Sequence, residues 1–301
     1  MIFSRIVYGL ARRVTTFTHG LIALPVNLWY ANSAGFRNNY GWTKQLHFFQ
    51  QAFSGNLQSE YDSGAQSLRS NGFLRISPQL PRNLLENIRS RLDERLKDEA
   101  CSVNSPNGAT RFLINPTHEI PELKHLLSDR IVDQVCSYYG CALRVETVRV
   151  WRNHHVPSID VDADDRISNT FHNDNLGVTG LRIFVYLSDG VNKDTGAFRF
   201  HDKPDTKKII RSLGYFHRNM LTQAMRRRLR DESTLKYFEG DLGDVCICNT
   251  QECLHGASIP GKGHFRDILQ FEVYPAEGPQ KYADEVLADL RADHEILGMR
   301  T

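Results

Sequence analysis

The chain has 301 residues with a formal net charge of +2, and 24% of the residues are charged. Hydrophobic residues make up 41%, which is typical of a globular protein and excludes a fibrous chain or one that is disordered throughout. A chain of this length can bury a substantial core in one or two domains, and we expect one. The near-neutral charge gives no reason to expect a nucleic-acid partner.

Residues 1–66 are expected to form an N-terminal extension, rich in Asn, Ser, Gly and aromatic residues without a clear period. Its apolar run GLIALPVNLWY is too short to span a bilayer and contains Pro25. No convincing signal-peptide cleavage site follows this run. Weak contact with a membrane surface stays open for this basic segment. Packing on the domain or on a partner subunit is the favoured interpretation.

Two amphipathic helices are predicted in the next part of the chain. After a short strand at GFLRI (72–76), leucines and one isoleucine recur at helical spacing between residues 77 and 100. These apolar positions are Leu84, Leu85, Ile88, Leu92 and Leu96. A second helix is predicted over residues 120–140, where Gly140 is a typical helix end.

The chain then changes period, and short β-branched or aromatic runs alternate with Gly, Asp and Asn turns. These runs are ALRVETVRVW (142–151), LRIFVYLSD (181–189), GAFRFH (196–201), DVCICN (244–249) and RDILQFEVYP (266–275). The pattern predicts a mainly β domain with flanking helices, a sandwich or barrel, over about residues 67–276. A polar helical insertion is expected at about 204–238 and a C-terminal helix at 277–301.

The six cysteines form no C-x-x-C pair and no zinc-ribbon spacing. A chain of this size does not need disulfide bonds for stability. We therefore expect reduced thiols and a cytoplasmic location. Cys246 and Cys248 are interpreted as small hydrophobic residues on a strand.

His172 and Asp174 stand two residues apart before an apolar run. In a strand such residues share a face, so they can offer one imidazole and one carboxylate to a single ion. The candidate third ligand is His255, which follows a strand opened by Gly243 and Asp244. Two histidines and one carboxylate occupy one face of an octahedron and leave three positions open, as in non-haem Fe(II) oxygenases. A hydrogen-bonded structural cluster without an ion is the alternative.

Arg266 follows His255 by eleven positions and begins the next strand. A guanidinium at this place could pair bidentately with the distal carboxylate of a dianionic cosubstrate whose other end binds the metal. A buried salt bridge is the alternative role.

These motifs resemble the phytanoyl-CoA dioxygenase family of Fe(II)- and 2-oxoglutarate-dependent oxygenases, over roughly residues 68–275. The matching segments are HND at 172–174, TGAF at 195–198, GD at 243–244, HGAS at 255–258 and Arg266. A Ser-His pair that is frequent in the family is represented here by His201 alone.

The resemblance implies a double-stranded β-helix, or jelly-roll, with Fe(II) on His172, Asp174 and His255. It also implies that Arg266 binds the C5 carboxylate of 2-oxoglutarate. The expected reaction consumes O₂ and a small-molecule or lipid-like substrate, and releases succinate and CO₂. Asp174 favours hydroxylation or a related oxidation, because halogenases of this type carry a small residue at its position.

Two further residues are candidates for binding the cosubstrate. Residues 181–187 alternate between two faces, and Tyr186 lies on the face opposite Leu181 and Ile183. Tyr186 could line the pocket or pack in the core. Gln270 shares the face of Arg266 by its period of two, and it could equally be a plain polar residue of the core.

Several alternatives stay open. The triad could serve a jelly-roll hydrolase or isomerase that uses another divalent ion, or the chain could be a non-catalytic binding module. His154 and His155 precede an Asp-rich loop that is either a second cation site or a solvated lid. The run RRRLR (226–230) could bind a phosphate, a CoA or a nucleic acid, but a solvated helix face is the default interpretation.

Overall fold

The computed structural model describes residues 63–275, except for residues 79, 106–107, 141, 156–170, 175–179 and 213–231. Its strands are β1 (Phe73–Ile76), β2 (Ser102–Asn104), β3 (Thr110–Leu113), β4 (Leu143–His154), β5 (Leu181–Tyr186), β6 (Phe198–Phe200), β7 (Lys236–Phe238), β8 (Val245–Cys248), β9 (His255–Ala257) and β10 (Phe265–Pro275). Its helices are α4 (Ser63–Asn71), α5 (Arg82–Lys97), α6 (Pro116–Glu119), α7 (Asp129–Tyr139) and α8 (Lys203–Ser212), with 3-10 turns η2 (Pro121–Leu126) and η3 (Glu232–Thr234).

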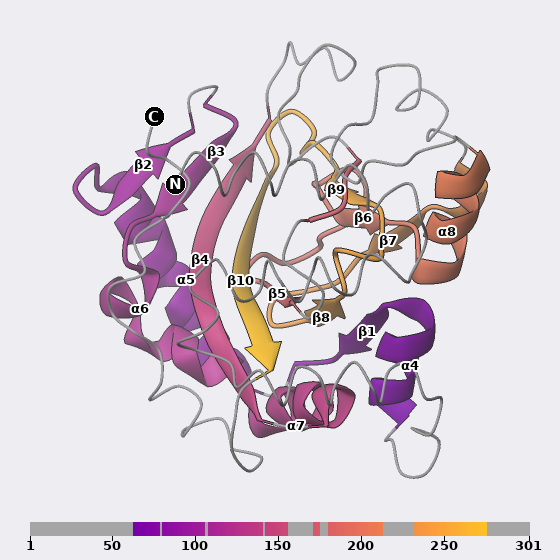
Figure 1. Cartoon of the computed structure of the whole chain (residues 1–301). Helices are drawn as coiled ribbons and strands as arrows, with labels where there is room; N and C mark the ends of the chain where they lie inside the picture. Colours follow the sequence, from indigo (N-terminus) through magenta and orange to yellow (C-terminus); the bar gives the residue numbers. More distant parts are fainter. Residues whose placement is uncertain are drawn as a thin grey trace, which may run out of the picture.

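These strands form two antiparallel sheets. The larger sheet has the order β1-β8-β5-β10-β4-β3-β2, and the smaller has the order β7-β6-β9. Figure 1 shows α5 and α6 on one side of the long β4–β10 pair and the smaller sheet on the other. The expected class, mainly β with flanking helices in a two-sheet jelly-roll, is confirmed.

The outer face of the larger sheet packs against the helices. Leu181, Ile183 and Val185 of β5 belong to the same buried cluster as the apolar stripe of α5. Four members of that stripe are buried as predicted, whereas Leu84 is only partly buried. The period-two pattern therefore separated the two faces of β5 correctly.

The inner faces of the two sheets form a second core. Its members are Phe184, Tyr186, Val191, Ala197, Phe198, Phe200, Phe238, Cys246, Cys248, Cys253 and Ile268. Cys246 and Cys248 are fully buried free thiols, as expected, and burial raises the pKa of both. Tyr186 lies in this core with no exposed surface.

The second predicted helix is divided in two. Pro121–Leu126 is a 3-10 turn, and α7 begins only at Asp129 because Ser128 is extended, with φ −68° and ψ 159°. Ser is a favoured residue at a helix start, so the break falls where a new helix can begin. Gly140 ends α7 in the left-handed conformation, with φ 70°, as expected.

Other boundaries differ from the expectation. α4 begins at Ser63, ahead of the expected limit at residue 66, and buries Gly64, Ala65 and Leu68. The expected insertion at 204–238 starts within α8 and ends in β7, which is a strand of the smaller sheet. The RRRLR run, the Asp-rich loop at 161–165 and the C-terminal segment 277–301 lie outside the described residues.

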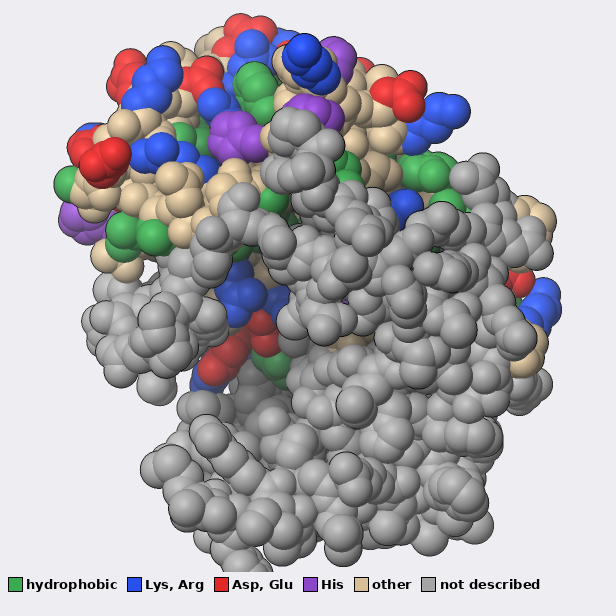
Figure 2. Space-filling model, turned by 90° about the horizontal axis from the view of Figure 1, so that it is seen from above, with side chains coloured by type: hydrophobic (Ala, Val, Ile, Leu, Met, Phe, Trp, Pro, Cys, Tyr) green, Lys and Arg blue, Asp and Glu red, His purple; other side chains and the backbone are tan. Residues whose placement is uncertain are grey.

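The surface carries mixed charge. Acidic, basic and histidine side chains are interspersed over the described part of the face in Figure 2, in agreement with the near-neutral net charge. Among the described helices, none has both the length and the apolar character that a membrane crossing needs.

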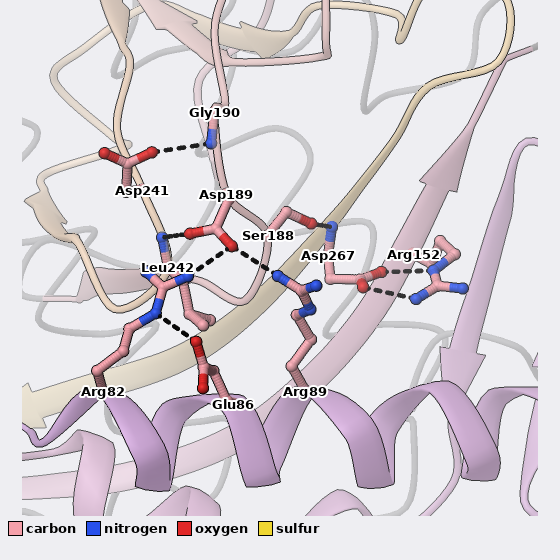
Figure 3. A network of polar contacts seen from close by, with 10 residues as sticks. All are labelled: Arg82, Glu86, Arg89, Arg152, Ser188, Asp189, Gly190, Asp241, Leu242 and Asp267. Atoms are coloured by element: carbon pink, nitrogen blue, oxygen red, sulfur yellow. Dashed lines mark hydrogen bonds and ion pairs between the residues drawn. The ribbon is translucent and has the colours of Figure 1, made fainter.

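Polar contacts at the end of β5 and the start of β10 connect these strands to α5 and β4 (Figure 3). Arg82 and Arg89 of α5 contact the Asp189 carboxylate at 2.8 and 2.6 Å. Asp267 accepts two hydrogen bonds from Arg152, each 2.7 Å long, and its backbone N–H donates to the Ser188 hydroxyl. The start of β10 is thus held by contacts from β4 and from the segment that follows β5.

Candidate metal centre

The structure brings His172, Asp174 and His255 together. Asp174 Oδ1 lies 3.6 Å from His172 Nε2 and 3.8 Å from His255 Nε2. One potential ligand atom from each of the three residues lies within 4.8 Å of the others. One ion can therefore contact all three side chains from a common side.

Backbone hydrogen bonds explain why residues far apart in sequence meet here. His172 and His255 pair as an antiparallel bridge, with two N–H···O bonds of 2.9 Å. The Asp174 N–H donates to the Thr250 carbonyl at 3.0 Å. His255 follows β8 in the chain, as expected, and is itself the first residue of β9. The extended backbone at 172–174 directs both side chains to one face.

His255 is held as a neutral imidazole. Its Nδ1 lies 3.0 Å from the Cys253 carbonyl, which can only accept, so Nδ1 carries the proton and Nε2 keeps its lone pair. Burial lowers the pKa of His255 to about 3, with a further contribution from the charge of His172. A neutral ring with an oriented free nitrogen is what a metal ligand requires.

Asp174 is held as a carboxylate. Burial opposes its ionisation, but the neighbouring His172, His255 and Arg182 outweigh this and keep the pKa of Asp174 well below its usual range. Arg182 Nε and Thr250 Oγ1 donate to Asp174 Oδ2 at 3.0 and 2.8 Å. Since Oδ2 is occupied by these donors, Oδ1 is left for the ion.

This donor set fits Fe(II). Two imidazole nitrogens and one carboxylate oxygen on one side of an ion suit a divalent transition metal and leave the opposite positions open. The hydrogen bonds of His255 Nδ1 and Asp174 Oδ2 orient these two candidate ligands, as in known metal sites.

Arg266 lies on the inner face of β10 and is 2% exposed. Its Nη1 donates to the Gly196 carbonyl and its Nη2 to Asn153 Oδ1, while its Nε has no partner among the described residues. A guanidinium has five N–H groups, so donors remain for a carboxylate. Burial lowers the pKa of Arg266, whereas Tyr186 and Asp267 act in the opposite direction.

The salt-bridge alternative for Arg266 finds no support in the described part of the chain, where no acidic side chain pairs with it. Asp267 is the acidic residue next to it in sequence, and the Asp267 carboxylate is bound by Arg152 instead. Arg266 is therefore a buried cation whose counter-ion is not supplied by the described residues.

The structure connects Arg266 to the metal ligands through packed aromatic side chains. The Phe198 ring lies 5.5 Å from the His255 ring, measured between centroids. The Phe198 N–H donates to the Tyr186 hydroxyl at 3.1 Å, and that hydroxyl donates to the Phe238 carbonyl at 2.5 Å. Tyr186 in turn supports the charge of Arg266. Its hydroxyl is thus occupied within the protein.

Gln270 lies further along the same face of β10. Its neighbours across the sheet are Arg149 of β4 and Phe184 of β5, whereas Arg266 pairs with Asn153. The Gln270 Nε2 is buried and has no hydrogen-bond partner. The sequence identified its face correctly but gave no sign that its amide is unpaired.

Sequence reasoning missed Thr250, Asn153 and Arg149. Thr250 lies in the turn between β8 and β9, where no period indicates which way a side chain points. Arg149 has a detectable signal, since it stands between Val148 and Val150 in a predicted strand. Of the other histidines considered, His155 Nδ1 contacts the Pro260 carbonyl at 2.8 Å.

No family model matches the sequence, and no curated protein matches it significantly. Solved structures of Fe/2-oxoglutarate-dependent oxygenases share this fold. SnoK, a non-haem α-ketoglutarate-dependent carbocyclase from nogalamycin biosynthesis, matches with TM-score 0.53 and 15% identity, over 78% of this chain and 92% of its own.

Two further structures agree. SnoN, an α-ketoglutarate-dependent epimerase from nogalamycin biosynthesis, has TM-score 0.52 and 15% identity over 74% of this chain and 84% of its own. HygX from Streptomyces hygroscopicus, with nickel and 2-oxoglutarate bound, has TM-score 0.51 and 22% identity over 74% of this chain and 90% of its own. At these identities the similarity establishes the fold.

Proposed function

We propose that the protein is a non-haem Fe(II)- and 2-oxoglutarate-dependent dioxygenase related to the phytanoyl-CoA dioxygenases. It would hydroxylate an unactivated C–H bond of a small-molecule or lipid-like substrate and release succinate and CO₂. The observation that carries the proposal is a triad open on one side, joined through Phe198 and Tyr186 to a buried arginine with uncommitted donors.

Each side chain has a definite task in this reaction. His172, Asp174 and His255 hold the iron, which when bound supplies the oxidation of the C–H bond at the expense of 2-oxoglutarate and O₂. Arg266 binds the C5 carboxylate of 2-oxoglutarate. Tyr186 fixes the position of Arg266 and, with Phe184 and Phe198, keeps water from this side of the site.

The closest alternatives differ in chemistry rather than in fold. A jelly-roll hydrolase or isomerase that uses another divalent ion would need the triad, but it would leave Arg266 without an anionic partner. A non-catalytic binding module would need neither the triad nor Arg266. SnoN and SnoK are an epimerase and a carbocyclase, so the mass of the product, with or without an added oxygen atom, distinguishes hydroxylation from these outcomes.

An anaerobic titration with Fe(II) and then 2-oxoglutarate tests the proposal. We expect a weak visible charge-transfer band when 2-oxoglutarate binds to the iron-loaded protein. Asp174→Ala should lose or alter the band, and Arg266→Ala should need at least about tenfold more 2-oxoglutarate, because a charge-assisted hydrogen-bond pair is removed.

Arg89→Ala is the matched control. Arg89 lies on α5, on the face of the larger sheet opposite the triad, and its partner is Asp189. It should give the wild-type band at the wild-type concentration. Iron binding without any effect of 2-oxoglutarate would favour the hydrolase or isomerase. Failure to bind iron would favour the binding module.

A further inference from the structure

Arg149 is a second arginine of the inner face. On β4 it stands directly across from Gln270 of β10, in the long strand pair at the centre of the molecule (Figure 1). Directly opposed residues of antiparallel strands point to the same side. Arg149 therefore shares the face of Gln270, Arg266 and Arg182, which is the face that carries the metal centre.

Arg149 has no direct ion-pair partner in the part of the chain that the structure describes. Its Nε is buried without a hydrogen-bond partner, and no described acidic side chain forms an ion pair with it. Burial lowers the pKa of Arg149, and the charge of Arg182 lowers it further, while Glu272 and Asp174 act in the opposite direction. An arginine kept in such surroundings is costly unless an anion joins it.

The two acidic neighbours are already occupied. Arg182 Nη1 donates to Glu272 Oε2 at 2.5 Å, and the Tyr274 hydroxyl donates to Glu272 Oε1 at 2.6 Å. Asp174 has its Oδ2 bound by Arg182 and Thr250 and its Oδ1 toward the two histidines. Both carboxylates therefore already have other partners, and neither forms an ion pair with Arg149 among the described residues.

Neither iron nor 2-oxoglutarate, as assigned above, would supply an anionic partner for Arg149. Iron is held through Asp174, and the distal carboxylate of 2-oxoglutarate is assigned to Arg266. Gln270 adds an unpaired amide N–H₂ next to Arg149. An arginine and an amide side by side, both with buried N–H groups that have no partner among the described residues, can donate to one oxyanion, as carboxylates and phosphates require.

We propose that Arg149 and Gln270 bind an oxyanion group, a carboxylate or a phosphate, of the molecule that is oxidised. Gln270 is then assigned to this group rather than to the cosubstrate. The proposal rests on the proposed function for the identity of the ligand as substrate, whereas the anion site itself is a property of the chain. The substrate class is an acid whose reacting carbon lies within reach of the metal.

Calorimetric titrations with simple probes test this site. The full-length protein, loaded anaerobically with Fe(II) and saturating 2-oxoglutarate, is titrated with hexanoate, hexyl phosphate and the neutral hexanamide, and the visible band is followed in parallel. We expect at least one charged probe to bind at least about tenfold more tightly than hexanamide and to shift the band. The stronger of the two charged probes distinguishes a carboxylate substrate from a phosphate.

Three variants locate the effect. Arg149→Met should reduce binding of the charged probe to that of hexanamide, and Gln270→Glu should do the same by placing a carboxylate against Arg149. Arg144→Met is the matched control on the same strand, because Arg144 is already paired with Glu146, and it should bind like wild type. All three should form the 2-oxoglutarate band within about twofold of the wild-type concentration.

Equal binding of charged and neutral probes, or wild-type binding by Arg149→Met, would overturn the proposal. A loss of 2-oxoglutarate binding in Arg149→Met but not in Arg266→Ala would also overturn it, since Arg149 would then anchor the cosubstrate. If wild type forms no band at all, the proposed function fails. Hexanoate and hexanamide titrations without iron then still decide whether Arg149 selects an anion.

Discussion

At the scale of single residues, Asp174 organises the candidate metal centre. Its two oxygens have different tasks, because Thr250 and Arg182 hold Oδ2 while Oδ1 faces both histidines. The sequence predicted the ligand itself from the H-x-D spacing. It could not predict Thr250 or Arg149, since a turn residue has no period and an unpaired guanidinium is recognised only when its neighbours in space are known.

Thr250→Val should weaken Fe(II) binding by roughly tenfold, because the valine keeps the shape of threonine but leaves Asp174 Oδ2 without one donor. Thr250→Ser retains the hydroxyl and should bind iron like wild type. Tyr274→Phe is a second control, since Tyr274 joins the same network through Glu272 without contacting Asp174. The measurement is an anaerobic Fe(II) titration, and equal affinities of the valine and serine variants would refute the role of Thr250.

At the scale of elements, the sequence predicted the strands with clear apolar or aromatic runs, including the short β1, β6 and β8, but it did not predict β2, β3, β7 and β9. β4, β5, β8 and β10 are recognisable as runs of β-branched, aromatic or small apolar residues, because each packs its two faces into different cores. β2, β3, β7 and β9 have three or four residues each, which is too few to establish a period. Their pairing depends on partners distant in sequence, as His255 with His172 shows.

The tight entry into β8 gives a prediction for one glycine. Gly243 has φ +91°, and a Cβ there would lie 2.7 Å from Leu85 Cδ1 and 3.1 Å from Pro78 Cβ. Gly243→Ala should lower the free energy of unfolding by about 1–3 kcal/mol because of backbone strain. The close contact of the new Cβ with Leu85 of α5 should lower it further.

Gly263→Ala separates these two costs. Gly263 has φ +83° but nothing within 4 Å of its added Cβ, so only the strain applies. Urea denaturation followed by circular dichroism should show the larger loss in Gly243→Ala. Equal losses in the two variants would mean that the contact with Leu85 does not constrain this turn.

At the scale of the whole molecule, the site lies between two sheets and its ligands come from separate segments of the chain. Ligand binding should therefore stabilise the folded domain as a unit. At a free concentration one hundred times the dissociation constant, a ligand specific for the folded state adds about 2.7 kcal/mol. For a domain of this size each kcal/mol raises the Tm by roughly 2–4 °C.

Thermal denaturation with Fe(II) and 2-oxoglutarate under anaerobic conditions measures this coupling. The Tm of wild type should rise with each addition, and the rise with 2-oxoglutarate should be absent in Arg266→Ala. A 2-oxoglutarate effect of the same size in that variant would place the cosubstrate away from Arg266.

The measurement that tests the central claim most directly is the number of Fe(II) ions bound per chain, by anaerobic equilibrium dialysis of the wild type and four alanine variants. Wild type should bind one ion. His172→Ala, Asp174→Ala and His255→Ala should each bind at least about tenfold more weakly. His154→Ala, a histidine outside the triad, should remain like wild type. Undiminished iron binding in folded triad variants would contradict the account.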